Sequence, residues 1–357
     1  MLNNFRFLTS GESHGKCLNA IIDGIPAGFE IDLNFINEEL KRRQGGYGRG
    51  DRMKIETDTV EIKSGVRFSK TTGAPICLEV KNKDYQNWLN IMSTENIDTD
   101  KSEKAFTKPR PGHADFAGAI KYDLKDLRDV LERSSARKTA IDVAVGAIAK
   151  QILKKFDITC TSNIIHIAGE CEDDKIKEKI ALTKEQGDTL GGKFEVIFKN
   201  LPIGLGSHVQ WDRKLDGLIS QAVMSIPAVK AVEFGAGADC ANMLGSELHD
   251  EIFVEDEKYF RKTNNAGGIE GGMTNGEDVV IKAVMKPIPT MKKPLSTVDL
   301  KDKTQTQAHF ERSDVCAVSA CAVVAEAMIA CVLLDAFLDK FGKDNISEIK
   351  NNYSNGK

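Results

Sequence analysis

The chain has 357 residues, of which 41% are hydrophobic and 29% are charged. This is the balance of an ordinary globular protein, and it excludes wholesale disorder. The formal net charge of −4 argues against a general nucleic-acid binder, because binding to a phosphate backbone needs an excess of basic surface. The eight cysteines form no C-x-x-C pair and no Cys/His zinc spacing, and the N-terminus has no apolar signal core. We therefore expect reduced thiols, no metal site and a cytoplasmic protein.

In the first half of the chain, the distribution of hydrophobic residues predicts mainly short strands. These strands are expected at 5–8, 18–22, 60–66 and 75–80. A helix is expected at 34–44, ending where a glycine-rich loop begins. The stretch 84–108 is polar with weak periodicity, so we expect an excursion or mobile loop there, and its composition suggests a lid.

The second half carries the strongest helix, at 135–156, where apolar residues recur at helical spacing. The other elements predicted are helices at 114–122 and 212–224 and strands at 158–167, 194–198 and 279–285. Residues 315–334 form a largely apolar stretch with a single charged residue, Glu326. Because a carboxylate in the middle of a membrane span is costly, we expect a buried central helix and no membrane. The polar end of the chain, 343–357, is expected to fray.

Strands and helices mix here without a regular βαβ rhythm. This favours an α+β fold or a layered sandwich over a doubly wound sheet. No linker-like break divides the chain, so we expect one unit over 1–342, with sheets around central helices, followed by the tail at 343–357.

The first motif that could carry chemistry is SGESHG at 10–15. It contains G-x-S-x-G, the nucleophile-elbow pattern of α/β-hydrolases. That pattern needs a strand–turn–helix, whereas strand-like residues follow it here, so a serine hydrolase using Ser13 is the weaker alternative. A glycine-rich turn with an incidental serine and histidine is another. We favour a functional His14 on a tight, exposed loop.

Two further motifs combine glycine or proline with arginine. The stretch 44–50 is glycine-rich, with Arg43 just before it and Arg49 within it, but it lacks the G-K-[ST] of a Walker loop. Its glycines would let a phosphate or carboxylate approach the backbone closely. In RPGHAD at 110–115, the proline and glycine fix a turn that places His113 near a helix start.

A fourth motif, ERSSARKT at 132–139, opens the strongest helix. Ser134 or Ser135 can cap that helix, and Arg133 and Arg137 would then lie beside its exposed N–H groups. A helix N-terminus with two arginines is a good anion site.

Three late segments complete the set. The stretch 264–272 is dense in glycine without being G-x-G-x-x-G, which argues against a Rossmann NAD site. The stretch 286–290 (KPIPT) is rigid and extended, and Asp314 is placed to cap the apolar helix. Two histidines, several loop arginines and serine-rich helix starts together suit one or two phosphorylated, acidic small molecules.

These motifs resemble a known family. GESHG, RPGHAD, RSSAR, NNAGGI-x-GG, KPIPT and an R-x-D before an E-A-M-containing helix occur here in the order found in chorismate synthases, over nearly the whole chain. The resemblance implies a β-α-β sandwich, a homotetramer, and no nucleic-acid or membrane partner. It also implies a lyase of the shikimate pathway that converts 5-enolpyruvylshikimate 3-phosphate to chorismate by anti-1,4-elimination of phosphate, requiring reduced FMN without net redox change.

The resemblance also implies roles for individual residues. His14 would protonate the departing phosphate, and His113 would protonate or balance the reduced flavin. Ser13 and Asp314 would relay a proton at the flavin. The residues implied to meet FMN are Arg133, Ser134, Ser135, Ala228, Gly271, Lys286, Pro287, Ile288, Pro289, Thr290 and Arg312. The positions implied for NADPH or substrate anions are Arg43 and Arg49, with Arg137 as a further substrate contact.

The chain departs from the family pattern at three positions. Ser313 stands where many members have histidine, Pro227 precedes Ala228 where a polar residue is common, and Glu270 replaces an apolar residue. A non-catalytic flavin- or phosphometabolite-binding protein on the same scaffold is therefore an alternative from a different class. The length resembles that of monofunctional members, which rely on an external reductant, although self-reduction with NADPH stays open.

Overall fold

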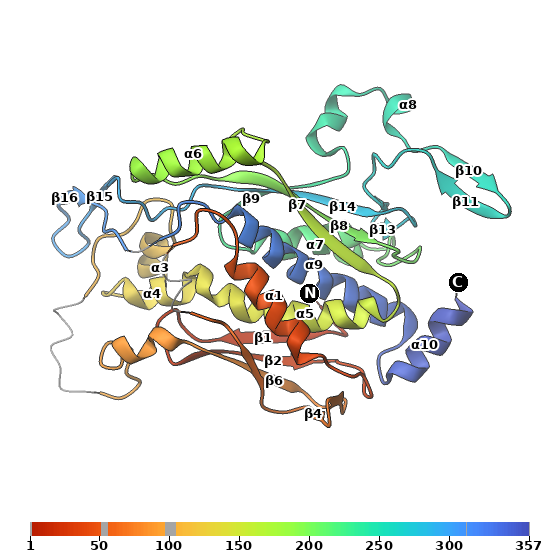
Figure 1. Ribbon diagram of the computed structural model, residues 1–357, viewed down its shortest axis with the longest axis horizontal. Helices are drawn as coiled ribbons and strands as arrows, with labels where there is room; N and C mark the ends of the chain where they lie inside the picture. The colour runs from red at the N-terminus through yellow and green to blue at the C-terminus, as the bar shows by residue number, and fades with distance from the viewer. Residues whose placement is uncertain (1, 51–55, 97–104, 312, 357) are drawn as a thin grey trace.

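The computed structural model describes residues 2–50, 56–96, 105–311 and 313–356. Two four-stranded antiparallel sheets lie on either side of a layer of helices (Figure 1). The main hydrophobic core fills both interfaces between the helices and the sheets. The α+β sandwich with sheets around central helices is thus confirmed.

The first sheet has the strand order β1–β2–β6–β3. Its strands are β1 (Arg6–Ser10), β2 (Cys17–Asp23), β6 (Ile76–Lys81) and β3 (Val60–Ile62). Alternate residues of β2 and β6 are buried, because one face of this sheet packs on the helices. The strand expected at 60–66 is shorter than predicted. Gly65 turns the chain there with φ 80°, and the hairpin of β4 (Val66–Arg67) and β5 (Lys70–Thr71) follows.

The second sheet has the order β7–β8–β14–β9. Its strands are β7 (Thr159–Ile167), β8 (Gly192–Lys199), β14 (Val279–Met285) and β9 (Val229–Phe234). Phe194, Val196 and Phe198 of β8 point into the core with Ile281 of β14. The predictions for β7, β8 and β14 hold, whereas β9 has no counterpart in the sequence analysis.

The central layer contains α1 (Leu33–Gln44), α5 (Thr139–Lys154) and α9 (Val318–Phe341). The helices α5 and α9 pack closely because Gly146 has no side chain; a Cβ there would lie 2.4 Å from the Cβ of Ala327. By length and composition α9 could span a membrane, but 89% of its most apolar stretch is buried inside the fold. The prediction of a buried central helix is therefore confirmed. Such a helix is apolar on all sides because protein surrounds it on all sides.

The C-terminal segment is folded, so the expectation of a frayed end is wrong. Residues Ile346–Asn355 form α10, which Asn345 caps by accepting from the backbone N–H of Glu348 at 2.9 Å. Tyr353 packs against Phe341 and Phe337 of α9 and is 9% exposed. Ile349 of α10 is also completely buried, so two apolar side chains on one face dock this otherwise polar helix on the core.

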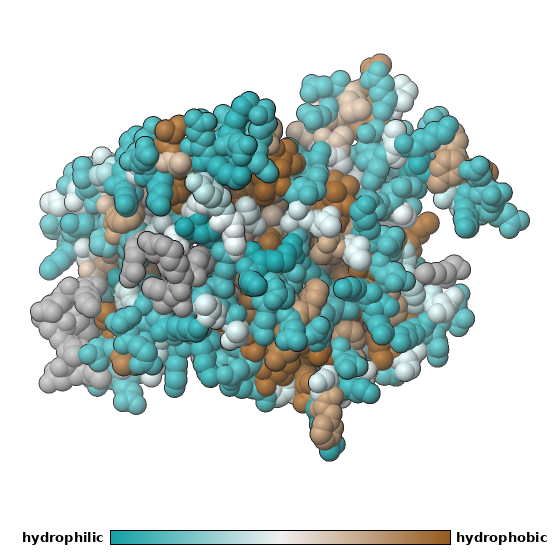
Figure 2. Space-filling view, viewed as in Figure 1, coloured by the Kyte–Doolittle hydropathy of each residue, from teal (hydrophilic) through white to brown (hydrophobic). Residues whose placement is uncertain are grey.

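Most of the remaining elements lie around this sandwich. The helices outside the layer are α3 (Asp115–Tyr122), α4 (Arg128–Ser134), α6 (Asp173–Glu185) and α8 (Gly245–Leu248). A further helix, α7 (Leu215–Met224), belongs to the central layer, because it packs on α9 and β9 and buries Leu215, Ile219 and Val223 in the main core. The 3-10 turns are η1 (Lys83–Asn87), η3 (Ala136–Lys138), η4 (Trp211–Arg213) and η5 (Gly237–Asn242). The short strands are β10 (Ile252–Glu255), β11 (Lys258–Arg261), β12 (Ile269–Glu270), β13 (Met273–Thr274), β15 (Ser296–Val298) and β16 (Gln305–Gln307). The hairpin β10–β11 projects from the body, and the face seen in Figure 2 is mostly hydrophilic.

All eight cysteines are free thiols, but they differ in exposure. Burial raises the pKa of Cys321 to about 12 and moves that of Cys331 above the usual range. Because the thiolate is the reactive form, iodoacetamide at neutral pH should alkylate the exposed Cys171 and Cys240 first. Cys321 and Cys331 should react only after unfolding. Mass spectrometry of native and denatured samples tests this, and rapid native labelling of Cys331 would contradict it.

Candidate active site

His14 lies on the loop between β1 and β2 and meets a buried carboxylate from α4. The Nδ1 atom of His14 lies 2.8 Å from Oε1 and 3.1 Å from Oε2 of Glu132. The backbone N–H of His14 donates to Oε2 at 2.7 Å, and that of Ser13 donates to the backbone carbonyl of Glu132 at 3.0 Å. The side chain of Glu132 is 2% exposed. Its carboxylate contacts both the imidazole ring and the backbone N–H of His14, and it thereby holds the loop between β1 and β2 in place.

An aromatic residue from the segment after η1 packs on the same histidine. The rings of Trp88 and His14 are stacked, with centroids 4.0 Å apart and an interplanar angle of 23°. The indole N–H donates to Asp84 at 3.2 Å, and the guanidinium of Arg128 lies 5.0 Å from the centroid of the indole. The start of the stretch 84–108 therefore covers His14. Its closing on ligand stays a prediction, and residues 97–104 lie outside the described part of the chain.

His113 is held in a second, similar set of contacts. Its Nδ1 lies 2.5 Å from Oδ1 of Asp115, and Arg110 donates to the other oxygen of Asp115 at 2.8 Å. Arg110 also donates to Thr290 at 2.8 Å and lies 3.0 Å from Nδ1 of His113. Asp115 opens α3, as the turn at 110–115 predicted. Each histidine is thus paired through Nδ1 with a buried carboxylate that also binds an arginine.

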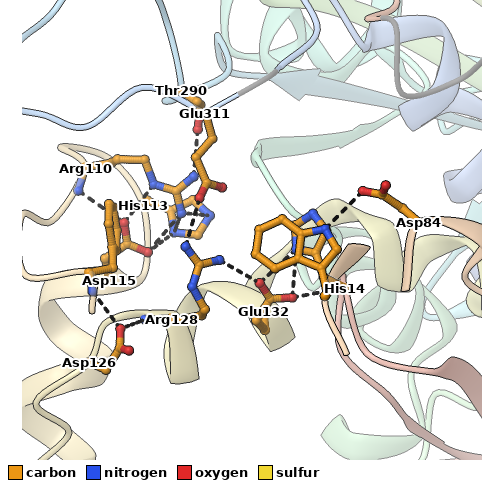
Figure 3. A network of polar contacts seen from close by, with 12 residues as sticks. His14, Asp84, Arg110, His113, Asp115, Asp126, Arg128, Glu132, Thr290 and Glu311 are labelled. Carbon is orange, nitrogen blue, oxygen red and sulfur yellow. Dashed lines mark hydrogen bonds and ion pairs between the residues drawn. The ribbon is translucent and has the colours of Figure 1, made fainter. Parts of the chain in front are cut away.

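The two sets are joined through α4 (Figure 3). The side chain of Arg128 donates to Glu132 at 3.1 Å and to Glu311 at 3.4 Å, and its backbone N–H donates to Asp126 at 2.9 Å. Asp126 also accepts from the backbone N–H of Phe106 at 2.9 Å, and the guanidinium of Arg110 lies 5.9 Å from the centroid of the Phe106 ring. A small separate core holds α3 and α4 together; it consists of Phe106, Ala119, Leu127 and Leu131. This core keeps the two histidine loops in one region although they are far apart in sequence.

Both carboxylates are ionised at neutral pH. Burial pushes the pKa of Glu132 up, but hydrogen bonds and charge from His14 and Arg128 outweigh it and leave the pKa below its usual range. The same balance holds at Asp115, where burial is outweighed by hydrogen bonds from His113 and Arg110, so that pKa is also low. The site can therefore keep negative charge beside each imidazole.

The RSSAR segment does not form the simple helix start that the sequence predicts. Ser134 ends α4 and its hydroxyl donates to the carbonyl of Val130 at 2.7 Å. Ser135 caps the turn η3, which precedes α5. The guanidinium of Arg133 donates to Thr9 and Gly11, at 2.9 Å and 3.0 Å from their carbonyls. Arg133 therefore ties the histidine loop to α4.

Two of the predicted anion-binding arginines meet on an internal carboxylate. Arg43 and Arg137 donate to Asp58 at 2.9 Å and 2.7 Å, and their side chains are 4% and 2% exposed. Arg137 also donates to Asn82 at 2.9 Å. Asn82 in turn donates to the carbonyls of residues 12 and 15. These arginines thus brace the His14 loop from inside.

Asp314 does not cap α9, so that prediction is wrong. The helix begins at Val318 and has no side-chain cap, and the carbonyl of Val315 accepts a backbone hydrogen bond from Leu190 at 2.8 Å. Asp314 accepts instead from the backbone N–H of Gly50 at 2.6 Å, and Arg49 lies 3.2 Å away. Ser313 is described, but Arg312 lies outside the described residues.

The stretch 286–290 lies beside the His113 turn. Lys286 donates to the carbonyl of Gly112 at 2.5 Å, and Thr290 accepts from Arg110. Ala228 immediately precedes β9 and has φ 71°, and its carbonyl accepts from the backbone N–H of Lys286 at 2.9 Å. Ala228 thus lies next to Lys286. Pro287, Ile288 and Pro289 complete the stretch.

The glycine-rich loop at 264–272 carries the third departure from the family pattern. Glu270 pairs with Arg261 at 2.8 Å, so its added charge is balanced locally. A Cβ placed on Gly271 would meet nothing within 4 Å, so the backbone there is open to a ligand.

The serine hydrolase alternative does not fit this geometry. Ser13 lies between two antiparallel strands, β1 and β2, whereas a nucleophile elbow joins a strand to a helix. Ser13 is also 2% exposed. Among the residues that the structure describes, no group of three or more His, Cys, Asp or Glu is arranged to hold a metal ion.

Two histidines, each paired with a buried carboxylate, form the kind of site that can exchange protons with a bound ligand. The chain matches the chorismate synthase family over residues 5–338, and it belongs to that family. A relative from Thermoanaerobacter pseudethanolicus, named chorismate synthase, is 54% identical and covers 98% of this chain and 97% of its own length. One from Aquifex aeolicus with the same name is 48% identical over 99% of this chain.

A solved structure gives the same result for the fold. The crystal structure of a chorismate synthase covers 100% of this chain and 98% of its own, with a TM-score of 0.80 at 39% identity. The family membership supports chorismate synthase function, and therefore an enzyme that acts on a small molecule.

Proposed function

We propose that the chain eliminates phosphate from 5-enolpyruvylshikimate 3-phosphate by an anti-1,4 route to give chorismate, as a carbon–oxygen lyase that requires reduced FMN without net redox change. The observation that supports this best is the pair of histidines, each held through Nδ1 by a buried carboxylate. Both histidines lie in motifs that resemble those of the family. A site with two imidazoles, each oriented by a carboxylate, suits a reaction that needs two separate proton transfers, one at the substrate and one at the flavin.

The residues around the histidines fit a flavin phosphate and a polyanionic substrate. Lys286 and Arg110 place cationic donors at the His113 turn. The Nε of Arg128 is buried without a hydrogen-bond partner among the described residues, as are those of Arg43 and Arg261. We propose that Arg133, Ser134, Ser135, Ala228, Gly271, 286–290 and Arg312 hold FMN. When bound, reduced FMN would supply an electron-rich ring system that assists departure of the phosphate and takes part in removing the ring hydrogen.

We assign each proton transfer to a different residue of the chain. His14 gives a proton to the departing phosphate, which lowers the charge on the leaving group. His113 balances charge at the flavin, and Ser13 and Asp314 are proposed as a proton relay. Arg49 is a candidate contact for substrate or nicotinamide anions. Arg43 and Arg137 remain candidates too, although an anion there would compete with Asp58.

An anaerobic assay tests the proposed function. Purified protein, photoreduced FMN and 5-enolpyruvylshikimate 3-phosphate should yield chorismate and phosphate together, followed by absorbance and phosphate release. Neither product should form with oxidised FMN. Binding of reduced FMN without phosphate release would overturn the proposal and favour a flavin-binding protein on the same scaffold.

We further propose a cytoplasmic homotetramer that takes reduced flavin from an external source, without nucleic-acid or membrane partners. The net charge of −4 and the bacterial biosynthetic relatives support this setting. Sedimentation analysis tests the assembly. Chorismate formation with FMN and NADPH alone, under anaerobic conditions in the dark, would show that the protein reduces its own flavin.

A further inference from the structure

We propose that Glu132 is a positioning residue that fixes the tautomer of His14, with a proton on Nδ1 and with Nε2 as the atom that exchanges a proton with the ligand. What Nε2 does in turnover rests on the proposed function. The tautomer itself does not, because it follows from contacts within the chain. None of the motif roles implied by the resemblance involves Glu132, Trp88 or Arg128.

The first support is the chemistry of the acceptor. An ionised carboxylate has only acceptor sites, and both oxygens of Glu132 lie within 3.1 Å of Nδ1 of His14. Glu132 is further held by Arg128 at 3.1 Å and by the backbone N–H of His14 at 2.7 Å. A buried carboxylate fixed at three points cannot turn away, so Nδ1 must carry the proton that it accepts.

The second support is the fixed plane of the ring. Trp88 stacks on His14 with centroids 4.0 Å apart, and Trp88 is itself held by Asp84 at its N–H and by Arg128 over its ring. A flip of the imidazole would exchange Nδ1 for a carbon atom opposite Glu132 and lose both hydrogen bonds. The charged groups around the pair are Arg128, Asp84 and Glu311, and none of the three replaces Glu132 as the acceptor for Nδ1.

For catalysis, the consequence is that the His14 ring and its hydrogen bonds to Glu132 need not rearrange when His14 gives up a proton. When the imidazolium gives its proton, the N–H bond at Nε2 breaks, its electron pair stays on Nε2, and an O–H bond forms on the leaving phosphate. The neutral ring that remains is the Nδ1–H tautomer, which Glu132 already binds. A histidine with a free Nδ1 would instead be free to take the opposite tautomer, as catalytic triads show when their orienting carboxylate is lost.

Nitrogen NMR of protein labelled with ¹⁵N-histidine reads the tautomer directly, without flavin or substrate. The signals of His14 are those missing from His14→Ala. At a pH where the ring is neutral, the wild-type protein should show a protonated Nδ1 and a bare Nε2. Glu132→Leu should shift His14 towards the opposite tautomer. Glu132→Gln should give a mixture, since an amide can accept or donate, and Asp123→Asn should leave the signals unchanged as a control for charge at an exposed site.

Kinetics separates positioning from a merely structural role. Glu132→Leu should lower kcat by about 10²- to 10⁴-fold, with KM little changed, and Glu132→Gln should recover part of the loss. If Glu132→Leu does not fold, the isosteric Glu132→Gln still tests the tautomer. An unchanged Nδ1–H tautomer in the variants, or the opposite tautomer in the wild type, would overturn the inference. Absence of chorismate from wild-type protein with the expected tautomer would overturn only the proposed function.

Discussion

Replacing either His14 or His113 by alanine is expected to lower kcat for chorismate formation by about two to four orders of magnitude, the usual contribution of a positioned general acid or base. The fold should survive both changes. After His14→Ala, Glu132 still binds Arg128 and a backbone N–H. After His113→Ala, Asp115 still binds Arg110. Neither substitution leaves a buried carboxylate unpaired, so the loss should be chemical.

The measurement is the anaerobic assay with reduced FMN, with thermal unfolding followed by circular dichroism for each variant. His208→Ala is the matched control, because His208 is exposed and lies in none of the candidate motifs. It should keep wild-type activity. Full turnover in both His14→Ala and His113→Ala would remove the proton-transfer roles proposed for these residues.

Replacing Lys150 by methionine is expected to destabilise the protein by about 3–5 kcal/mol, the usual effect of breaking a buried ion pair on one side. Lys150 and Arg42 both bind Glu326 and Glu39 between α1, α5 and α9. Glu326 is fully buried and Lys150 is 6% exposed. Methionine fills a similar volume, but it removes one of the two cations that these buried carboxylates share and leaves them with Arg42 and with the hydroxyl of Ser162, which donates to Glu326.

This cluster should also make stability fall in acid. Burial raises the pKa of Glu326, but hydrogen bonds from Arg42 and Lys150 outweigh it and lower the pKa to about 2 from an ordinary 4.5. A lowered carboxyl pKa stabilises the fold fully above about pH 4.5, and the stabilisation is lost as pH falls towards 2. In Lys150→Met the carboxyl loses a cationic partner, so the dependence on pH between 4.5 and 2 should be weaker.

Urea unfolding at pH 7 and at several values below 4.5 tests both expectations. Lys175→Met is the control, because it breaks an exposed pair with Glu172 and should change stability by less than about 1 kcal/mol. Equal stability of Lys150→Met and the wild type at pH 7 would show that the ion pairs of this cluster do not stabilise the fold.

Elements with a strong period could be read from the sequence. The helix expected at 34–44 is α1 within one residue, and the strand expected at 279–285 is β14. The helix α6 could not be read in this way, since only Ile176, Ile180 and Thr183 of it are buried and the rest is charged. A helix with so few buried positions has too weak a hydrophobic periodicity to be predicted from its sequence.

About half of the candidate active site could be predicted from the sequence. His14 and His113 stand in rigid glycine turns, and Asp115 lies close enough to His113 in sequence to have signalled its role. Glu132 stood beside the RSSAR motif without an assigned role, and Trp88 carried no signal. Both reach His14 through the tertiary fold, and contacts between distant segments leave no trace in a single sequence.

The sequence by itself determined the family, the α+β class and the two histidines, because ordered motifs and periodicity are properties of local stretches. Only the tertiary structure decided where the charged side chains point. Arg43 and Arg137 turn inward to Asp58, Arg133 binds the carbonyls of the His14 loop, and Asp314 meets Gly50 instead of capping α9. The physical reason is that a long charged side chain goes to whichever buried partner satisfies it, and that partner is chosen by the packing of remote elements.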